Sequence, residues 1–110
     1  MTLLTADLDP ATAAAASAEG NLLLIDVREV DEYRALRGAE ATHIPLGRLS
    51  AHLDCLAAAG TPVAFVCRSG SRSAMATRVA RRTGIDAHNV RGGMLAWERQ
   101  GLPVQRGGPA

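Results

Sequence analysis

The chain has no lysine, because all twelve of its basic residues are arginines. Catalysis through a lysine Schiff base is therefore excluded. Cysteine is also scarce, with Cys55 and Cys67 as its only representatives. Two cysteines cannot build a disulfide framework, and a zinc site would need more ligands close together. We therefore expect no metal and no cofactor.

Long apolar runs and a strong charge imbalance are missing too. No run approaches the roughly 20 residues that a membrane-spanning helix needs. The net charge of +1 gives no reason to expect nucleic acid or a membrane as a partner. Asp7 and Asp9 precede the first basic residue, Arg28, so no signal peptide is visible. We expect a cytoplasmic protein, where free thiols stay reduced.

The length of 110 residues, with 47% hydrophobic and 21% charged residues, is typical of a single soluble domain. We expect one domain at residues 1–105 and a frayed tail at residues 106–110. Strand and helix patterns alternate along this domain. The strands are expected at residues 2–4, 22–25, 42–44, 63–66 and 87–90, and the helices at residues 10–20, 29–36, 48–59, 71–84 and 94–100.

Strands that alternate with helices over short connections predict an α/β fold, an open parallel sheet of about five strands with helices on both faces. Ligands of such sheets bind beyond the carboxyl ends of the strands. Asp26, Cys67 and the turn after Val90 fall at such ends. Apolar spacing predicts which helix residues face inward: Val30, Tyr33 and Leu36, then Leu49, Leu53 and Leu56, then Met75, Val79 and the neighbouring alanines.

The most informative segment is residues 63–80, where a buried strand runs into Cys67, a short polar loop and a helix. This geometry directs several backbone N–H groups into one concavity at a helix N-terminus. A cysteine at the mouth of such a cradle, close to Arg68 and Arg72, has a pKa lowered to roughly 3.5–7.5 from about 8.5. The interpretation requires a thiol open to solvent and amides turned toward it.

The arginines of this region suggest what the loop binds. No Asp or Glu lies between Leu56 and Ile85. Arg78, Arg81 and Arg82 are expected on a solvated helix face, whereas Arg68 and Arg72 lie in the loop and point to a small anionic substrate.

No histidine is assigned as a base for the thiol. His52 and His88 are expected on the surface, and nothing in the sequence forces His43 toward Cys67. Loop amides and arginines suffice to hold a thiolate. A purely structural Cys67 is disfavoured by the polar loop that follows it. Cys55 is expected in the core or at its boundary, with a resolving thiol as the alternative.

The number of loop residues separates two chemistries. Cysteine-dependent phosphatases place five residues between the cysteine and the arginine, and here four lie between Cys67 and Arg72. A shorter loop makes a narrower cradle, which suits one sulfur atom better than a phosphate. Ser73, in the phosphatase position, cannot replace the guanidinium fork. A phosphatase or arsenate reductase is the weaker hypothesis.

The chain resembles the single-domain rhodaneses, which are thiosulfate sulfurtransferases. The resemblance covers nearly the whole chain, at residues 24–29 with Glu32 and Tyr33, residues 44–46, residues 67–73, residues 91–97 and residues 101–104. It implies the rhodanese-like fold and a cycle through a persulfide on Cys67. The sulfur donor would be thiosulfate or another persulfide, and the acceptor cyanide, a thiol or a thioredoxin-like protein.

The resemblance also implies roles for particular residues. The amides of the loop would stabilise the persulfide anion; the loop residues are Arg68, Ser69, Gly70, Ser71, Arg72 and Ser73. Arg68 would bind the anionic donor, and Arg72 would support the loop. Asp26 would tie the loop to the neighbouring strand end, or else cap a helix or pair with Arg28. A persulfide carrier or a regulatory module would share every loop residue, so it stays an alternative.

Overall fold

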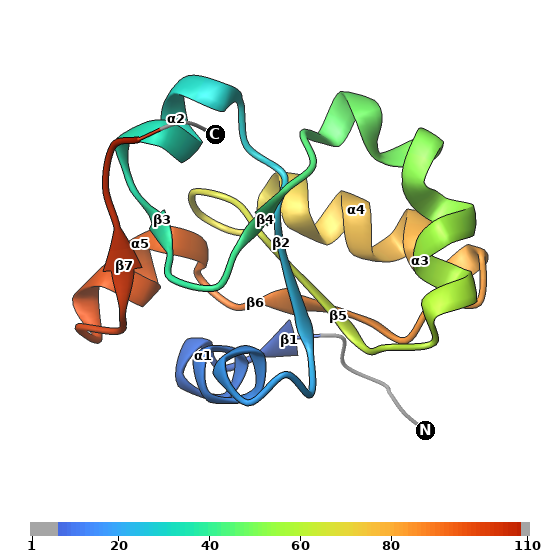
Figure 1. Cartoon of the computed structure of the whole chain (residues 1–110), viewed down its shortest axis with the longest axis horizontal. Coiled ribbons are helices and arrows are strands. Elements are labelled where there is room, and N and C mark those ends of the chain that lie inside the picture. Colours follow the sequence, from blue (N-terminus) through green and yellow to red (C-terminus); the bar gives the residue numbers. More distant parts are fainter. Residues whose placement is uncertain (1–6, 109–110) are drawn as a thin grey trace.

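The computed structural model describes residues 7–108, and its centre is a sheet of five parallel strands (Figure 1). The sheet order is β1-β6-β5-β2-β4. Its strands are β1 (Asp7–Leu8), β2 (Leu23–Asp26), β4 (Thr42–His43), β5 (Val63–Val66) and β6 (Ala87–Val90). The predicted parallel sheet is thus confirmed, with β5 at its centre. The strand expected at residues 2–4 lies outside the described residues.

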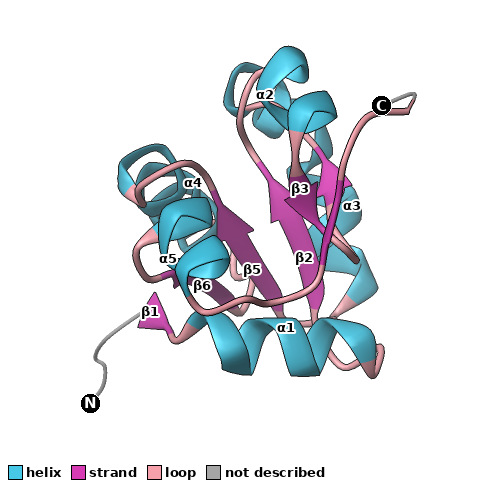
Figure 2. Ribbon diagram, turned by 90° about the vertical axis from the view of Figure 1, so that its left-hand side faces the viewer, coloured by secondary structure: helices cyan, strands magenta, loops and turns pink. Residues whose placement is uncertain are grey.

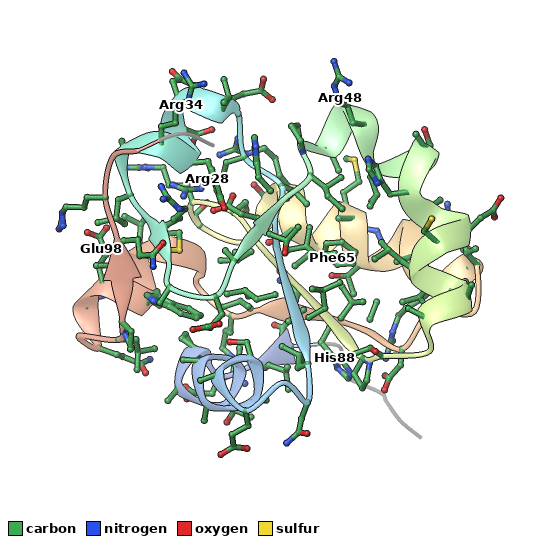
Figure 3. All side chains as sticks on the ribbon, in the orientation of Figure 1. Arg28, Arg34, Arg48, Phe65, His88 and Glu98 are labelled. Atoms are coloured by element: carbon green, nitrogen blue, oxygen red, sulfur yellow. The ribbon has the colours of Figure 1, made fainter. Side chains whose placement is uncertain are left out.

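Helices cover both faces of this sheet, as predicted (Figure 1). One face packs against α3 (Leu53–Ala59) and α4 (Ser71–Arg82), the other against α1 (Pro10–Ala18) and α5 (Gly93–Arg99). Successive residues of β5 point to opposite faces, since Phe65 packs with the α3 and α4 side and Val66 with the α1 and α5 side. In Figure 3, Phe65 lies within the fold whereas Arg48 and Glu98 reach outward.

Strand register places two chain segments side by side where the strands end. Asp26, the last residue of β2, is paired with Val66, the last residue of β5. The chain therefore leaves both strands at the same edge, and Cys67 follows directly. Figure 2 shows the arrowheads of β2 and β5 directed toward the end where α2 (Val30–Ala35) lies.

Three expectations were wrong, two about which side chains are buried and one about a helix. Val30 is 43% exposed, because it opens the short helix α2 and only Tyr33 of that helix is buried. Met75 is 49% exposed, because the buried stripe of α4 runs through Ser73, Ala76, Thr77 and Ala80 instead. The single helix expected at residues 48–59 is a 3₁₀ helix, Leu46–His52, followed by α3.

A second, two-stranded sheet was not predicted. β3 (Arg37–Gly38) pairs antiparallel with β7 (Val104–Gln105), and Gly107, shortly after β7, contacts α2. In the segment expected as a frayed tail, the Gly107 amide donates to the Arg34 carbonyl at 2.7 Å, and its carbonyl accepts from Arg37 at 3.0 Å. None of the helices within residues 7–108 has the length and apolar character needed to cross a bilayer.

The start of α5 lies directly against the backbone that follows β5. Gly93 has a φ of +60°, and a Cβ built on it would lie 2.5 Å from the Cys67 carbonyl oxygen and 2.4 Å from that of Arg68. Real Cβ atoms do not approach backbone so closely, so this contact requires glycine.

We predict that Gly93→Ala destabilises the fold far more than Gly101→Ala. Both glycines have a positive φ, which costs alanine about 1–2 kcal/mol, but nothing lies within 4 Å of a Cβ at Gly101. The clash at Gly93 should add about 1–3 kcal/mol. Urea denaturation of both variants measures the difference, and equal losses would show that the close contact costs nothing.

Candidate active site

The sulfur of Cys67 is the acceptor of several converging hydrogen bonds. The Gly70 amide donates to Sγ at 3.1 Å, the Ser73 amide at 3.4 Å and the Ser73 hydroxyl at 3.2 Å. Gly70 is the N-cap of α4, with a φ of +113°, and Ser73 lies in the first turn of that helix. The predicted cradle at a helix N-terminus is therefore present, with its amides turned toward the sulfur.

The first turn of α5 holds the other side of the loop. The Met94 amide donates to the Cys67 carbonyl at 2.8 Å, and the Leu95 amide donates to the Arg68 carbonyl at 3.1 Å. The carbonyl and the N–H of a planar trans peptide point in opposite directions. Carbonyls held toward α5 therefore leave the following N–H groups, such as that of Ser69, facing away from α5 and toward the cradle.

These donors decide the protonation of the thiol. Burial raises the pKa of Cys67, but hydrogen bonds from the Ser73 hydroxyl and from the amides of Ser73, Gly70 and Ser69 lower it by more. The net result is a pKa below the ordinary value of a cysteine. Hydrogen bonds to the charged form favour that form, so the cradle favours a thiolate.

The depth of the cysteine differs from the expectation. Cys67 was placed at the mouth of the cradle, and the structure places it at the floor, where it is 1% exposed. The cause is its direction, since Cys67 continues the alternation of β5 and its side chain packs with the core residues on the α4 side of the sheet. The requirement for inward-facing amides is met, and the requirement for an open thiol is not.

Arg72 is held by an acid that the sequence reasoning did not assign. Its guanidinium makes a two-point contact with Glu32 of α2, with Nη1–Oε1 at 2.9 Å and Nη2–Oε2 at 3.0 Å. Glu32 Oε1 also accepts from the Glu29 amide at 3.0 Å, which fixes the carboxylate. The two residues are 40 positions apart in the sequence, so no local pattern pairs them. The one indication was that acidic residues open α2, whereas the loop with Arg72 has none.

Asp26 and Arg28 form a buried pair of their own. Arg28 Nη2 lies 2.8 Å from Asp26 Oδ2, and the Arg28 amide also donates to Asp26 Oδ1 at 3.0 Å. No hydrogen bond within residues 7–108 links the Asp26 side chain to the loop, so its role is the alternative one, partner of Arg28. His43 Nε2 lies 2.7 Å from the Arg28 carbonyl and its ring stacks on Tyr33.

Other predicted residues lie around the loop or away from it. Arg68 and Ser69 are exposed beside the cradle, and within residues 7–108 Arg68 makes no ion pair. The helix-face arginines, Arg78, Arg81 and Arg82, are exposed as expected. Cys55 is exposed on α3, so the expectation that it lies in the core or at its boundary was wrong. No group of three or more His, Cys, Asp or Glu side chains in the described part of the chain could hold a metal ion.

A rhodanese-like domain model matches residues 9–100, from the N-cap of α1 to the end of α5. The chain belongs to the rhodanese-like domain family. The match includes the Cys67 loop, Glu32 and the glycine turn before α5, so the residues that build the cradle all lie within it. Family membership supports sulfur transfer in general.

Similar proteins agree with this family. The chain is 37% identical over 86 residues to "Putative sulfurtransferase YtwF" of Bacillus subtilis, covering 78% of this chain and 82% of that protein. It is 35% identical over 78 residues to "Putative sulfur carrier protein YrkF" of the same organism, covering 70% of this chain but 42% of that protein. A rhodanese-related protein of Thermoplasma volcanium superposes with a TM-score of 0.80 at 26% identity, covering 90% and 96% of the two chains.

We predict that Ser73→Ala moves the titration of the Cys67 thiol to higher pH, because the variant loses the hydroxyl that donates to Sγ at 3.2 Å. The ultraviolet absorbance of the thiolate, followed against pH in a Cys55→Ser background, measures this shift. Ser71→Ala is the matched control, since Ser71 is exposed and makes no hydrogen bond to the sulfur. Coincident titration curves for all three proteins would contradict the assignment.

A second prediction concerns acid stability. The Arg72 hydrogen bond lowers the pKa of Glu32 from 4.5 to about 2. A lowered pKa stabilises the fold fully above pH 4.5 and loses that effect as the pH falls toward 2. Glu32→Gln should therefore be less stable than the parent protein at pH 7, and the difference should shrink below pH 4.5.

Denaturant unfolding across this pH range measures the effect of Glu32→Gln. Glu98→Gln is the control, because Glu98 is exposed and makes no ion pair among the described residues. A stability difference for Glu32→Gln that is constant from pH 7 to pH 2 would show that its charge plays no part.

Proposed function

We propose that the protein is a sulfurtransferase that carries sulfane sulfur as a persulfide on Cys67. The observation that supports this most directly is the set of donors on one sulfur atom, from the Gly70 amide, the Ser73 amide and the Ser73 hydroxyl. Such a cradle stabilises an anionic sulfur without a histidine base. Membership of the rhodanese-like family is the second support.

The reaction with thiosulfate balances without an oxidant. The Cys67 thiolate attacks the outer sulfur of thiosulfate, the new bond joins Sγ to that sulfur, and the old bond to the sulfonate sulfur breaks. Sulfite leaves with the electron pair, and the cysteine keeps a persulfide anion. A nucleophilic acceptor, such as cyanide or a thiol, then takes the outer sulfur and regenerates the thiolate.

The two arginines of the loop, Arg68 and Arg72, have different roles in this proposal. Arg72 already binds Glu32 at two points, which fixes its guanidinium beside the loop and partly neutralises it. Arg68 is exposed and makes no ion pair within residues 7–108, so we assign to it the attraction of the doubly charged donor. Loop support for Arg72 and donor binding for Arg68 are the roles that the family resemblance implies.

The burial of Cys67 limits what reaches it. Because Cys67 is 1% exposed, a donor reaches Sγ only when the surrounding residues move. A small donor with a terminal sulfur requires the smallest displacement of the residues around Cys67. This favours thiosulfate or a low-molecular-weight persulfide over a bulky phosphoester. The restricted access to Cys67, together with the short loop, argues against a phosphatase or an arsenate reductase.

We predict that incubation with thiosulfate adds the mass of one sulfur atom to the intact protein, and that a reducing agent removes it. Cys67→Ser should abolish the gain, while Cys55→Ser, which removes the exposed thiol, should retain it. Intact mass spectrometry checks both variants. No gain with thiosulfate or any persulfide donor would overturn the proposal, as would turnover of an aryl phosphate or arsenate faster than that of thiosulfate.

A persulfide carrier is the second candidate, favoured by the similarity to a protein named as a sulfur carrier. Such a carrier would accept the sulfur in the mass experiment but turn over slowly with cyanide. Slow thiosulfate:cyanide turnover beside fast transfer to a protein thiol, for example of a thioredoxin-like acceptor, would assign the carrier role.

A further inference from the structure

Asn89 is a buried polar residue with a side-chain oxygen that is unpaired among the described residues, which destabilises the fold and which packing alone does not explain. It lies in β6, is 7% exposed, and its Oδ1 has no hydrogen-bond partner within the described residues. A buried acceptor without a partner destabilises the fold, because no hydrogen bond replaces the water that the group has lost. A leucine of similar size would avoid that cost, so the amide needs another reason for being there.

The other end of the amide shows where it acts. Nδ2 donates to the Gly70 carbonyl at 3.3 Å and to Asp7 Oδ1 at 3.3 Å. Both partners accept and neither donates, so the reversed amide orientation would set oxygen against oxygen, and the orientation with Nδ2 facing them is the favourable one. Asn89 therefore links the Cys67 loop to the edge strand β1 across β6.

The position of the Gly70 carbonyl affects the direction in which α4 begins. Gly70 is the N-cap of α4, and its carbonyl also accepts the first helical hydrogen bond, from the Ala74 amide at 3.0 Å. The donors to Sγ come from Gly70 itself and from Ser73, three residues on. The Gly70 carbonyl belongs to the Gly70–Ser71 peptide, and a rotation of that peptide would turn the first turn of α4, with the Ser73 donors, away from the sulfur.

We propose that Asn89 is a positioning residue for the reactive sulfur: its side-chain amide holds the Gly70 carbonyl toward β6, so that the first turn of α4 directs the Ser73 donors at Cys67 Sγ. It does not touch the sulfur and acts only through the loop. Its relevance to sulfur transfer rests on the function proposed above, whereas its effect on the thiol does not.

The test is a titration of the thiol in Asn89→Leu, which keeps the side-chain volume and removes the donor. In a Cys55→Ser background, the thiolate absorbance should titrate at higher pH than in the parent protein. At a fixed pH below the parental midpoint, alkylation of Cys67 should slow at least about threefold, following the lost thiolate fraction. His88→Ala is the control, because His88 lies next to Asn89 on β6 and its ring contacts Asp86 at 2.8 Å, away from the Cys67 loop.

Loss of stability with an unchanged thiol titration would overturn the proposal, since it would make Asn89 a merely structural residue. If Asn89→Leu does not fold, Asn89→Ser and the unmodified protein decide instead. In the unmodified protein, the side-chain amide resonances of Asn89 should shift as Cys67 ionises, and resonances that ignore this titration would overturn the proposal. No sulfur donor is used, so these outcomes are independent of the thiosulfate experiment.

Discussion

The convergence of hydrogen-bond donors on one sulfur atom is the interaction on which the rest of this structure depends. Its donors belong to the start of α4, and their direction follows from Gly70, whose φ of +113° no other residue type adopts readily. The sheet supplies the position, because β5 ends at its centre and delivers Cys67 to the first turn of α4. Helix, turn and strand are all needed to bring an anion-stabilising cradle to a buried thiol.

Burial and hydrogen bonding act in opposite directions on the pKa of this thiol. Removing a cysteine from water raises its pKa, and here the donated hydrogen bonds outweigh that effect. Arg72 is paired with Glu32 at two points, which fixes its guanidinium beside the loop and partly neutralises its charge. Arg68 then remains the exposed cation beside the cradle.

Sequence reasoning found what depends on local pattern. The strand at Val63–Val66, the helix that follows it and the Cys67 loop were all visible in apolar spacing and turn residues. What it missed depends on contacts between segments far apart in the sequence: the Glu32–Arg72 pair, the Asn89 link and the β3–β7 sheet. The burial of Cys67 was missed because the alternation of a strand was not continued one residue beyond its end.

The short strands at the two ends of the described chain have a mechanical consequence. β1 reaches the loop through Asp7 and Asn89, and β7 reaches it through β3, the adjacent helix α2 and the Glu32–Arg72 pair. Tension applied to either end, for example by a fused module or a surface tether, would pull on strands that are linked through these contacts to the Cys67 loop. A fusion or an affinity tag attached near β1 or β7 can therefore change the reactivity of Cys67.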